Sequence, residues 1–91
     1  MSRIASRIDP RSPVFDQNKV QSQRLQETLR ARMAIATAGG AEKLRARHHY
    51  RGKHLVRDRI DRLIDPGTAF LELSPLAAWG QYDNQVPAAG I

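Results

Sequence analysis

The sequence has no cysteine and few aromatic residues, and each shortage removes a class of structure. Without cysteine, neither a disulfide nor a thiolate metal site can hold the 91 residues together. One Trp, two Tyr and two Phe provide little bulky apolar material, and no apolar run approaches the roughly 20 residues of a membrane helix. We therefore expect a cytoplasmic protein that makes no membrane contact and has a marginal core if it folds alone.

Basic residues are missing from the last third of the chain. All 15 Lys and Arg lie at or before Arg62, together with six acidic residues, so this part has a net charge of +9. Residues 63–91 hold three acidic residues and no basic one, a net charge of −3. The asymmetry favours an anionic partner for the basic part: nucleic acid, a phosphorylated cofactor or an acidic face of the same assembly.

Residue types that build catalytic and metal sites occur here without the spacing that such sites need. The three histidines, His48, His49 and His54, include no H-x-x-x-H pair with a nearby carboxylate. The side chains of the adjacent pair, His48 and His49, would point in different directions on a helix. Ser74 lacks the G-x-S-x-G setting of a nucleophile, and the glycines do not have P-loop spacing. The sequence therefore predicts no metal ligand and no catalytic residue on this chain.

The first part of the chain predicts an irregular arm and one long helix. Residues 1–15 contain two X-Pro steps, which disfavour helix in the residue before each proline, and Asp16 is the candidate N-cap. No Gly or Pro interrupts 17–38, where apolar residues at spacings of four, four and three share one helical face: Leu25, Leu29, Met33 and Ala36. Two glycines, at 39–40, are expected to end this helix.

Two shorter helices are predicted next. Residues 41–50 form a basic helix that the R-G-K segment at 51–53 should end. The clearest apolar stripe follows at i, i+4, i+7 and i+8, and we expect it to be covered in a core: Val56, Ile60, Leu63 and Ile64. The segment D-P-G at 65–67 should stop this third helix, because proline cannot continue it and glycine permits a turn.

The last quarter of the chain predicts strands. Residues 69–73 have the composition of a strand, 76–80 could form a helical turn that packs Trp79, and 88–91 look like the opening of a further strand that has been cut. The sequence thus predicts three parts: an irregular arm at 1–15, a helical lead-in at 16–65 and the truncated start of a larger domain at 66–91.

The motifs, taken in order, resemble one known family. The resemblance is to the N-terminal region of the carboxyltransferase (β) subunit of biotin-dependent acyl-CoA carboxylases. It rests on G-G-A-E-K (39–43), A-R-H (46–48), R-G-K (51–53), V-R-D-R-I-D-R-L-I-D-P-G (56–67), F-L-E-L-S-P-L-A-A (70–78) and V-P-A-A-G-I (86–91). The segment L-S-P-L-A-A is most similar to the methylcrotonyl-CoA carboxylase branch, with the geranyl- and propionyl-CoA carboxylases as further relatives. Three residues depart from the usual family pattern: Ala41, His54 and Trp79.

The resemblance implies a fold and an activity that composition does not. It implies an α+β chain whose helices lead into the first strands of a crotonase-like (ClpP/crotonase) carboxyltransferase domain, in a bacterial-like cytoplasmic protein. A full subunit would move a carboxyl group from carboxybiotin to 3-methylcrotonyl-CoA, in leucine degradation, using glycine-rich loops beyond Ile91. Biotin would be carried on a partner α subunit, coenzyme A would enter as the thioester substrate, and β subunits would form a homo-oligomer. The isolated chain would bind no cofactor and be inactive.

Four basic residues are the candidates for a position near the coenzyme A phosphates: Arg47, Arg51, Lys53 and Arg57. The alternative hypothesis is a small basic binding module for nucleic acid or an acidic protein. Against nucleic acid, Tyr50 is the one aromatic residue of the basic segment, and no known nucleic-acid-binding motif occurs. We therefore expect no nucleic acid partner. The two hypotheses differ in salt dependence, because a nucleic acid binder loses affinity steeply as salt rises.

Overall fold

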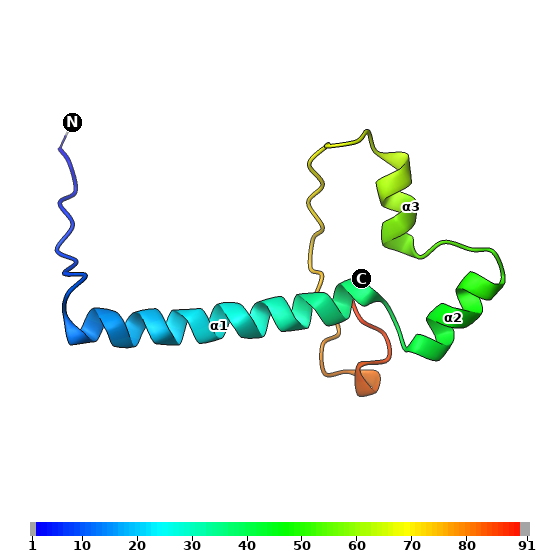
Figure 1. Ribbon diagram of the computed structural model, residues 1–91, viewed down its shortest axis with the longest axis horizontal. Helices are drawn as coiled ribbons and strands as arrows, with labels where there is room; N and C mark the ends of the chain where they lie inside the picture. Colours follow the sequence, from blue (N-terminus) through cyan, green and yellow to red (C-terminus); the bar gives the residue numbers. More distant parts are fainter. Residues whose placement is uncertain (1, 90–91) are drawn as a thin grey trace. The chain divides into compact units, whose positions relative to one another are not determined.

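A computed structural model describes residues 2–89, and within them the regular secondary structure is helical. Three α-helices follow one another, α1 (Pro13–Ala38), α2 (Glu42–Tyr50) and α3 (Val56–Leu63), and a short 3-10 turn, η1 (Tyr82–Asn84), comes later (Figure 1). The chain falls into two compact units that divide between Arg30 and Ala31, inside α1. Among the residues described, none of the helices has the length and apolarity that crossing a membrane requires.

The long helix α1 begins earlier than the predicted N-cap at Asp16. The Ser12 hydroxyl accepts a hydrogen bond from the Phe15 N–H at 3.1 Å, and the Ser12 carbonyl accepts the first helical bond from Asp16. Ser12 is therefore the N-cap. Pro13 takes the first helical position, where its missing N–H would have no partner in any case. Asp16 lies instead in the first turn, where the helix dipole favours a carboxylate.

Replacing the cap tests this start. Ser12→Ala removes the hydroxyl acceptor of the Phe15 N–H and is expected to cost about 1 kcal/mol in the first turn. That loss corresponds to about fivefold faster amide hydrogen exchange at Phe15, measured by NMR. The control is Ser22→Ala, in the middle of α1. Equal exchange rates in the two variants would contradict the cap.

The second helix, α2, ends in a Schellman motif built by the R-G-K segment. The Gly52 N–H donates to the His49 carbonyl at 2.9 Å, and the Lys53 N–H donates to the His48 carbonyl at 3.2 Å. This 5→2 and 6→1 pair satisfies carbonyls that the last turn of a helix leaves without donors. Gly52 has φ = +72°, a left-handed conformation that glycine adopts at little cost. The predicted helix end is therefore confirmed, with its mechanism.

The predicted strands are not found in the part of the chain that the structure describes. Residues 69–73 have neither helix nor ladder pairing, so the strand prediction is wrong there. A strand is stabilised by hydrogen bonds to a neighbouring strand, and this segment has none among residues 2–89. Its apolar side chains are accordingly 56, 81 and 80% exposed at Phe70, Leu71 and Leu73. For the second predicted strand, 88–89 are not strand, and 90–91 lie outside the described residues.

After α3 the chain turns at 65–67, as predicted, with the Thr68 N–H donating to the Asp65 carbonyl at 3.0 Å. It then returns through the second unit in an irregular path (Figure 1). Residues 76–80 form successive turns in place of the predicted helical turn. Trp79 lies beneath the guanidinium of Arg32, which is 5.1 Å from the centre of its ring. This cation–π contact fixes the returning segment against the C-terminal half of α1.

Candidate functional site

Arg57 joins three separate segments of the second unit. From the first turn of α3, its guanidinium donates to both carboxylate oxygens of Glu72, at 2.6 and 3.1 Å, and to the carbonyl of Ala36 at 3.0 Å. Both charged side chains are partly covered, being 25% and 35% exposed. A bidentate guanidinium–carboxylate pair of this kind is stronger and more directional than an ordinary surface ion pair. We call this arrangement of Arg57, Glu72 and Ala36 the Arg57 latch.

The latch supplies a hydrogen-bond donor to the C-terminal end of α1. Ala36 is in the last turn of the helix and is 1% exposed, and carbonyls there have no helical donor. Its carbonyl accepts from the Gly39 N–H at 3.2 Å as well as from Arg57. Gly39 has φ = +93°, which turns the chain immediately into α2. The end of α1, the start of α3 and the returning segment therefore share one hydrogen-bonded centre.

Beside the latch lies a groove of about 450 Å³ in the second unit. Apolar residues from α2, from α3 and its N-cap, and from the segments that follow make up much of its lining: Leu44, Leu55, Val56, Ile60, Phe70, Pro87 and Ala88. Several of its polar side chains are turned to partners within the chain. Arg45 donates to the Gly40 carbonyl at 3.0 Å, and the His48 ring is 3.0 Å from the His54 carbonyl. The groove therefore offers mainly apolar surface.

The predicted core stripe on α3 is only partly covered. Val56 and Leu63 are 68% and 84% exposed, while Ile60 and Ile64 are half-buried. The chain exposes 8575 Å² in total, against roughly 5,300 Å² for a typical folded monomer of 10.2 kDa. The open stripe on α3 is part of this excess, and no segment among residues 2–89 covers it fully.

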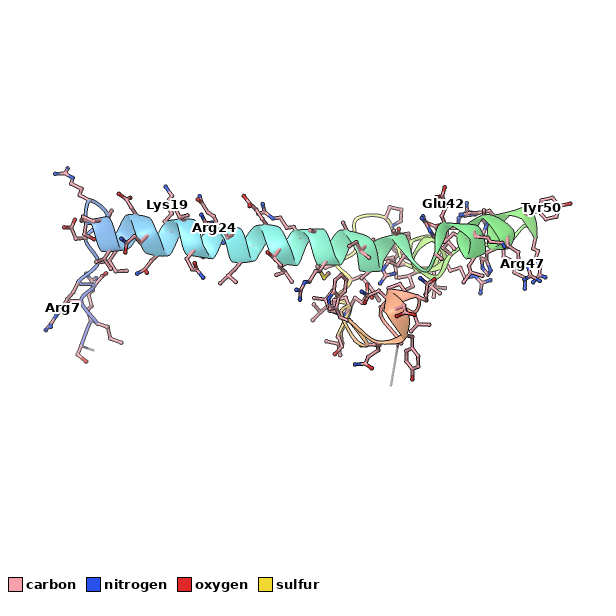
Figure 2. All side chains as sticks on the ribbon, turned by 90° about the horizontal axis from the view of Figure 1, so that it is seen from below. Arg7, Lys19, Arg24, Glu42, Arg47 and Tyr50 are labelled. Atoms are coloured by element: carbon pink, nitrogen blue, oxygen red, sulfur yellow. The ribbon has the colours of Figure 1, made fainter. Side chains whose placement is uncertain are left out.

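The structure separates the four predicted phosphate-facing residues into two groups. Arg47 on α2 and the two basic residues of the Schellman turn, Arg51 and Lys53, are exposed and follow one another at the end of one helix. Figure 2 shows Arg47 and the 93%-exposed Tyr50 pointing away from the ribbon of α2. Arg57 differs from these three residues, because its guanidinium is already hydrogen-bonded within the latch. A contact between any of the four and a phosphate stays a prediction.

The latch partner Glu72 was missed by the sequence analysis. The pair is 15 residues apart and spans a turn, so no helical spacing or motif links the two residues. Among residues 2–89, the structure brings no three His, Asp or Glu side chains together as metal ligands would be.

Comparisons with known proteins identify homologues of this chain. No family model matches the sequence. Among curated proteins, the biotin-dependent 3-methylcrotonyl-coenzyme A carboxylase beta1 subunit of Mycobacterium tuberculosis is 52% identical over 71 residues, 78% of this chain and 13% of the relative. The chain is homologous to acyl-CoA carboxylase beta subunits. The methylcrotonoyl-CoA carboxylase beta chains of Arabidopsis thaliana and Dictyostelium discoideum are 40% and 41% identical, over 92% and 91% of this chain and 14% of each relative.

The family resemblance predicted from the motifs is therefore confirmed, and the chain spans about one seventh of the length of these beta subunits. The match to the Arabidopsis beta chain covers 84 of the 91 residues. It leaves at most seven residues outside at either end, so it includes all three helices and the latch.

Proposed function

We propose that these residues are part of the carboxyltransferase subunit of a methylcrotonyl-CoA carboxylase, which moves a carboxyl group from carboxybiotin to 3-methylcrotonyl-CoA in leucine degradation. The observation that supports this most is the 52% identity to the M. tuberculosis beta1 subunit. In this proposal, biotin is carried by an α subunit, the β subunits form a homo-oligomer, and the assembly is cytoplasmic. Membranes and nucleic acid are not partners.

Within such a subunit, we assign these residues a supporting role. The helical lead-in, 16–65, would lie on the carboxyltransferase body through the open stripe of α3, and 66–91 would enter that body. The loops that stabilise the enolate and the biotin oxyanion would lie elsewhere in the subunit. Such stabilisation requires paired hydrogen-bond donors aimed at the oxygen on which negative charge develops. No residue of this chain is assigned to the chemical step.

The basic end of α2 is proposed to face the phosphates of coenzyme A. Arg47, Arg51 and Lys53 are exposed, lie within seven residues of one another and are held in register by the Schellman turn. Exposed cations attract phosphate groups mainly through long-range Coulomb interactions, which position the ligand without taking part in bond making. The charge of Arg57 is balanced by Glu72, so its share in this field is smaller.

Neutralising this cluster tests the assignment. In the complete subunit, changing Arg47, Arg51 and Lys53 together to Ala is expected to raise the KM for 3-methylcrotonyl-CoA about tenfold with kcat unchanged. Each exposed charge contributes about 0.5 kcal/mol, and binding lost equally from ground state and transition state leaves kcat intact. The matched control is the triple change of Lys19, Arg24 and Arg30 to Ala on α1. An equal rise in KM for both triples would show a general charge effect and remove the site.

The function itself is tested on the native product. An antibody against this chain is used to purify the product from source cells, and its intact mass and carboxylation activity are measured. We expect a species far heavier than 10.2 kDa that carboxylates 3-methylcrotonyl-CoA with ATP and bicarbonate, and that avidin inhibits. Faster carboxylation of geranyl-CoA or propionyl-CoA would reassign the substrate. A stable, inactive 10.2 kDa product would reject the enzymatic role.

A further inference from the structure

A second junction, besides the Arg57 latch, joins α2 to α3 at the carbonyl of His54. The Arg59 Nε–H donates to this carbonyl at 3.1 Å, and Nε2 of His48 lies 3.0 Å from it. A carbonyl oxygen can only accept, so the His48 ring nitrogen donates as well. His48 is in the last turn of α2 and Arg59 is in α3, so one acceptor ties both helices to the connection that includes the Schellman turn.

We propose that Arg59 contacts a phosphate group of coenzyme A, in the role that the sequence predicted for Arg57. The Nε of Arg59 is fixed at the His54 carbonyl, one residue beyond Lys53, so its guanidinium lies beside the turn that carries Arg51 and Lys53. The inference rests on the proposed function, and it adds a residue to the same phosphate site.

Arg57 and Arg59, both in α3, differ in what neutralises them. Arg57 donates to both carboxylate oxygens of Glu72, at 2.6 and 3.1 Å, so its charge and its planar fork are already engaged. Among residues 2–89, no carboxylate forms an ion pair with Arg59. Its bond to a neutral carbonyl orients the guanidinium without cancelling the charge, and that bond uses only one of the N–H donors of the side chain.

The two acidic residues of α3 are also turned away from Arg59. Successive residues of an α-helix are rotated by about 100°, which places Asp58 and Asp61 about 100° and 160° around the axis from Arg59. Asp58 lines the groove beside the Arg57 latch, and Arg59 is not among the residues that line it. Arg59 therefore adds its charge to the Schellman turn and not to the balanced charges of the groove.

The hydrogen bonds of the connection hold these cations in a defined arrangement. The Gly52 and Lys53 N–H groups are bonded to the end of α2, and the His54 carbonyl is bonded to both helices. Binding groups that are ordered before a ligand arrives lose less conformational entropy when it binds. A guanidinium whose orientation is fixed also matches the geometry of phosphate oxygens better than a mobile ammonium does.

Binding of coenzyme A to the complete subunit tests the proposal with two substitutions that separate charge from hydrogen bonding. Arg59→Gln places an amide nitrogen at the position of Nε, so it keeps a donor for the His54 carbonyl and loses the charge. Arg59→Lys keeps a charge and places a methylene group at that position. By isothermal titration calorimetry, we expect the Kd of coenzyme A to rise about fivefold in Arg59→Gln and about twofold in Arg59→Lys.

The matched control is Arg62→Gln, which removes the same charge from the same helix at an arginine that does not bond to the connection. We expect it to change the Kd little. A second ligand, 3′-dephospho-coenzyme A, locates the contact. If Arg59 contacts the 3′-phosphate, Arg59→Gln should not weaken binding of this ligand, whereas a contact with the diphosphate would preserve the fivefold loss. Thermal unfolding checks that all variants are folded.

Four outcomes would overturn the proposal. A greater loss in Arg59→Lys than in Arg59→Gln would show that Arg59 only holds the connection in place. Equal losses in Arg59→Gln and Arg62→Gln would show a general charge effect. An unchanged Kd in Arg59→Gln, with a raised Kd in the triple variant of Arg47, Arg51 and Lys53, would remove Arg59 and leave the proposed site. An unchanged Kd in both would remove the phosphate site as well.

Discussion

Replacing Arg57 with Met is expected to accelerate amide exchange in α3 about thirtyfold. Methionine keeps much of the apolar stem but donates no hydrogen bond, so the Ala36 carbonyl and the Glu72 carboxylate lose their shared partner. Charge-assisted hydrogen bonds of partly covered groups contribute about 1.5–3 kcal/mol, and about 2 kcal/mol corresponds to this factor. The measurement is NMR hydrogen exchange at Arg59 and Ile64, whose N–H groups donate within the helix.

Two further variants separate the latch from charge alone. Arg57→Lys keeps the charge but loses the planar fork, and it should recover only part of the protection. Arg62→Met removes an exposed arginine from the same helix and is expected to change exchange little. Combining Arg57→Met with Glu72→Gln should cost less than the sum of the two single changes, because both break one interaction. Strict additivity would show that the ion pair does not hold these segments together.

Replacing Gly39 with Ala is the second large effect that we expect. Gly39 has φ = +93°, which costs a residue with a Cβ roughly 1–2 kcal/mol. The new Cβ would also lie 3.4 Å from Cδ of Arg45, the side chain that bonds to the Gly40 carbonyl. We expect the backbone amides in the last turn of α1 and the first turn of α2 to exchange roughly ten to thirty times faster. The measurement is NMR hydrogen exchange at the N–H of residue 39, which is Ala in the variant, and at the N–H of Leu44.

The neighbouring glycine provides a matched control. Gly40 does not have a positive φ, and a Cβ there would meet the Gln85 carbonyl at 3.4 Å, the edge of ordinary contact. Gly40→Ala is therefore expected to change exchange by a factor of two or less. Similar losses at both positions would show that the turn needs flexibility at two residues and not one left-handed conformation.

Together, the two experiments probe the same centre from opposite sides. Gly39 sets the direction in which the chain leaves α1, and Arg57 holds the carbonyl that this turn exposes. If both variants loosen α3, the groove that α3 lines should lose its shape as well.

The sequence alone determined the helices and their ends. Local rules settle these: apolar spacing of four and three, glycine after the last turn, and proline with glycine as a stop. Even the error at the start of α1 was local, because Ser12 and Asp16 are both favourable caps and Pro13 decides between them by fitting the first helical position. The family, too, was accessible from ordered motifs, and the comparisons confirmed it.

Only the tertiary structure decided what lies beyond local spacing. Glu72 became the partner of Arg57 because a turn returns the chain to α3, a contact across 15 residues that no periodicity encodes. The strand predicted at 69–73 failed for the same reason, since strand formation depends on a neighbour that local sequence does not specify. The apolar stripe was correctly placed on one face of α3, but its expected burial in a core was found only in part. Periodicity fixes which side chains share a face, whereas burial depends on what packs against it.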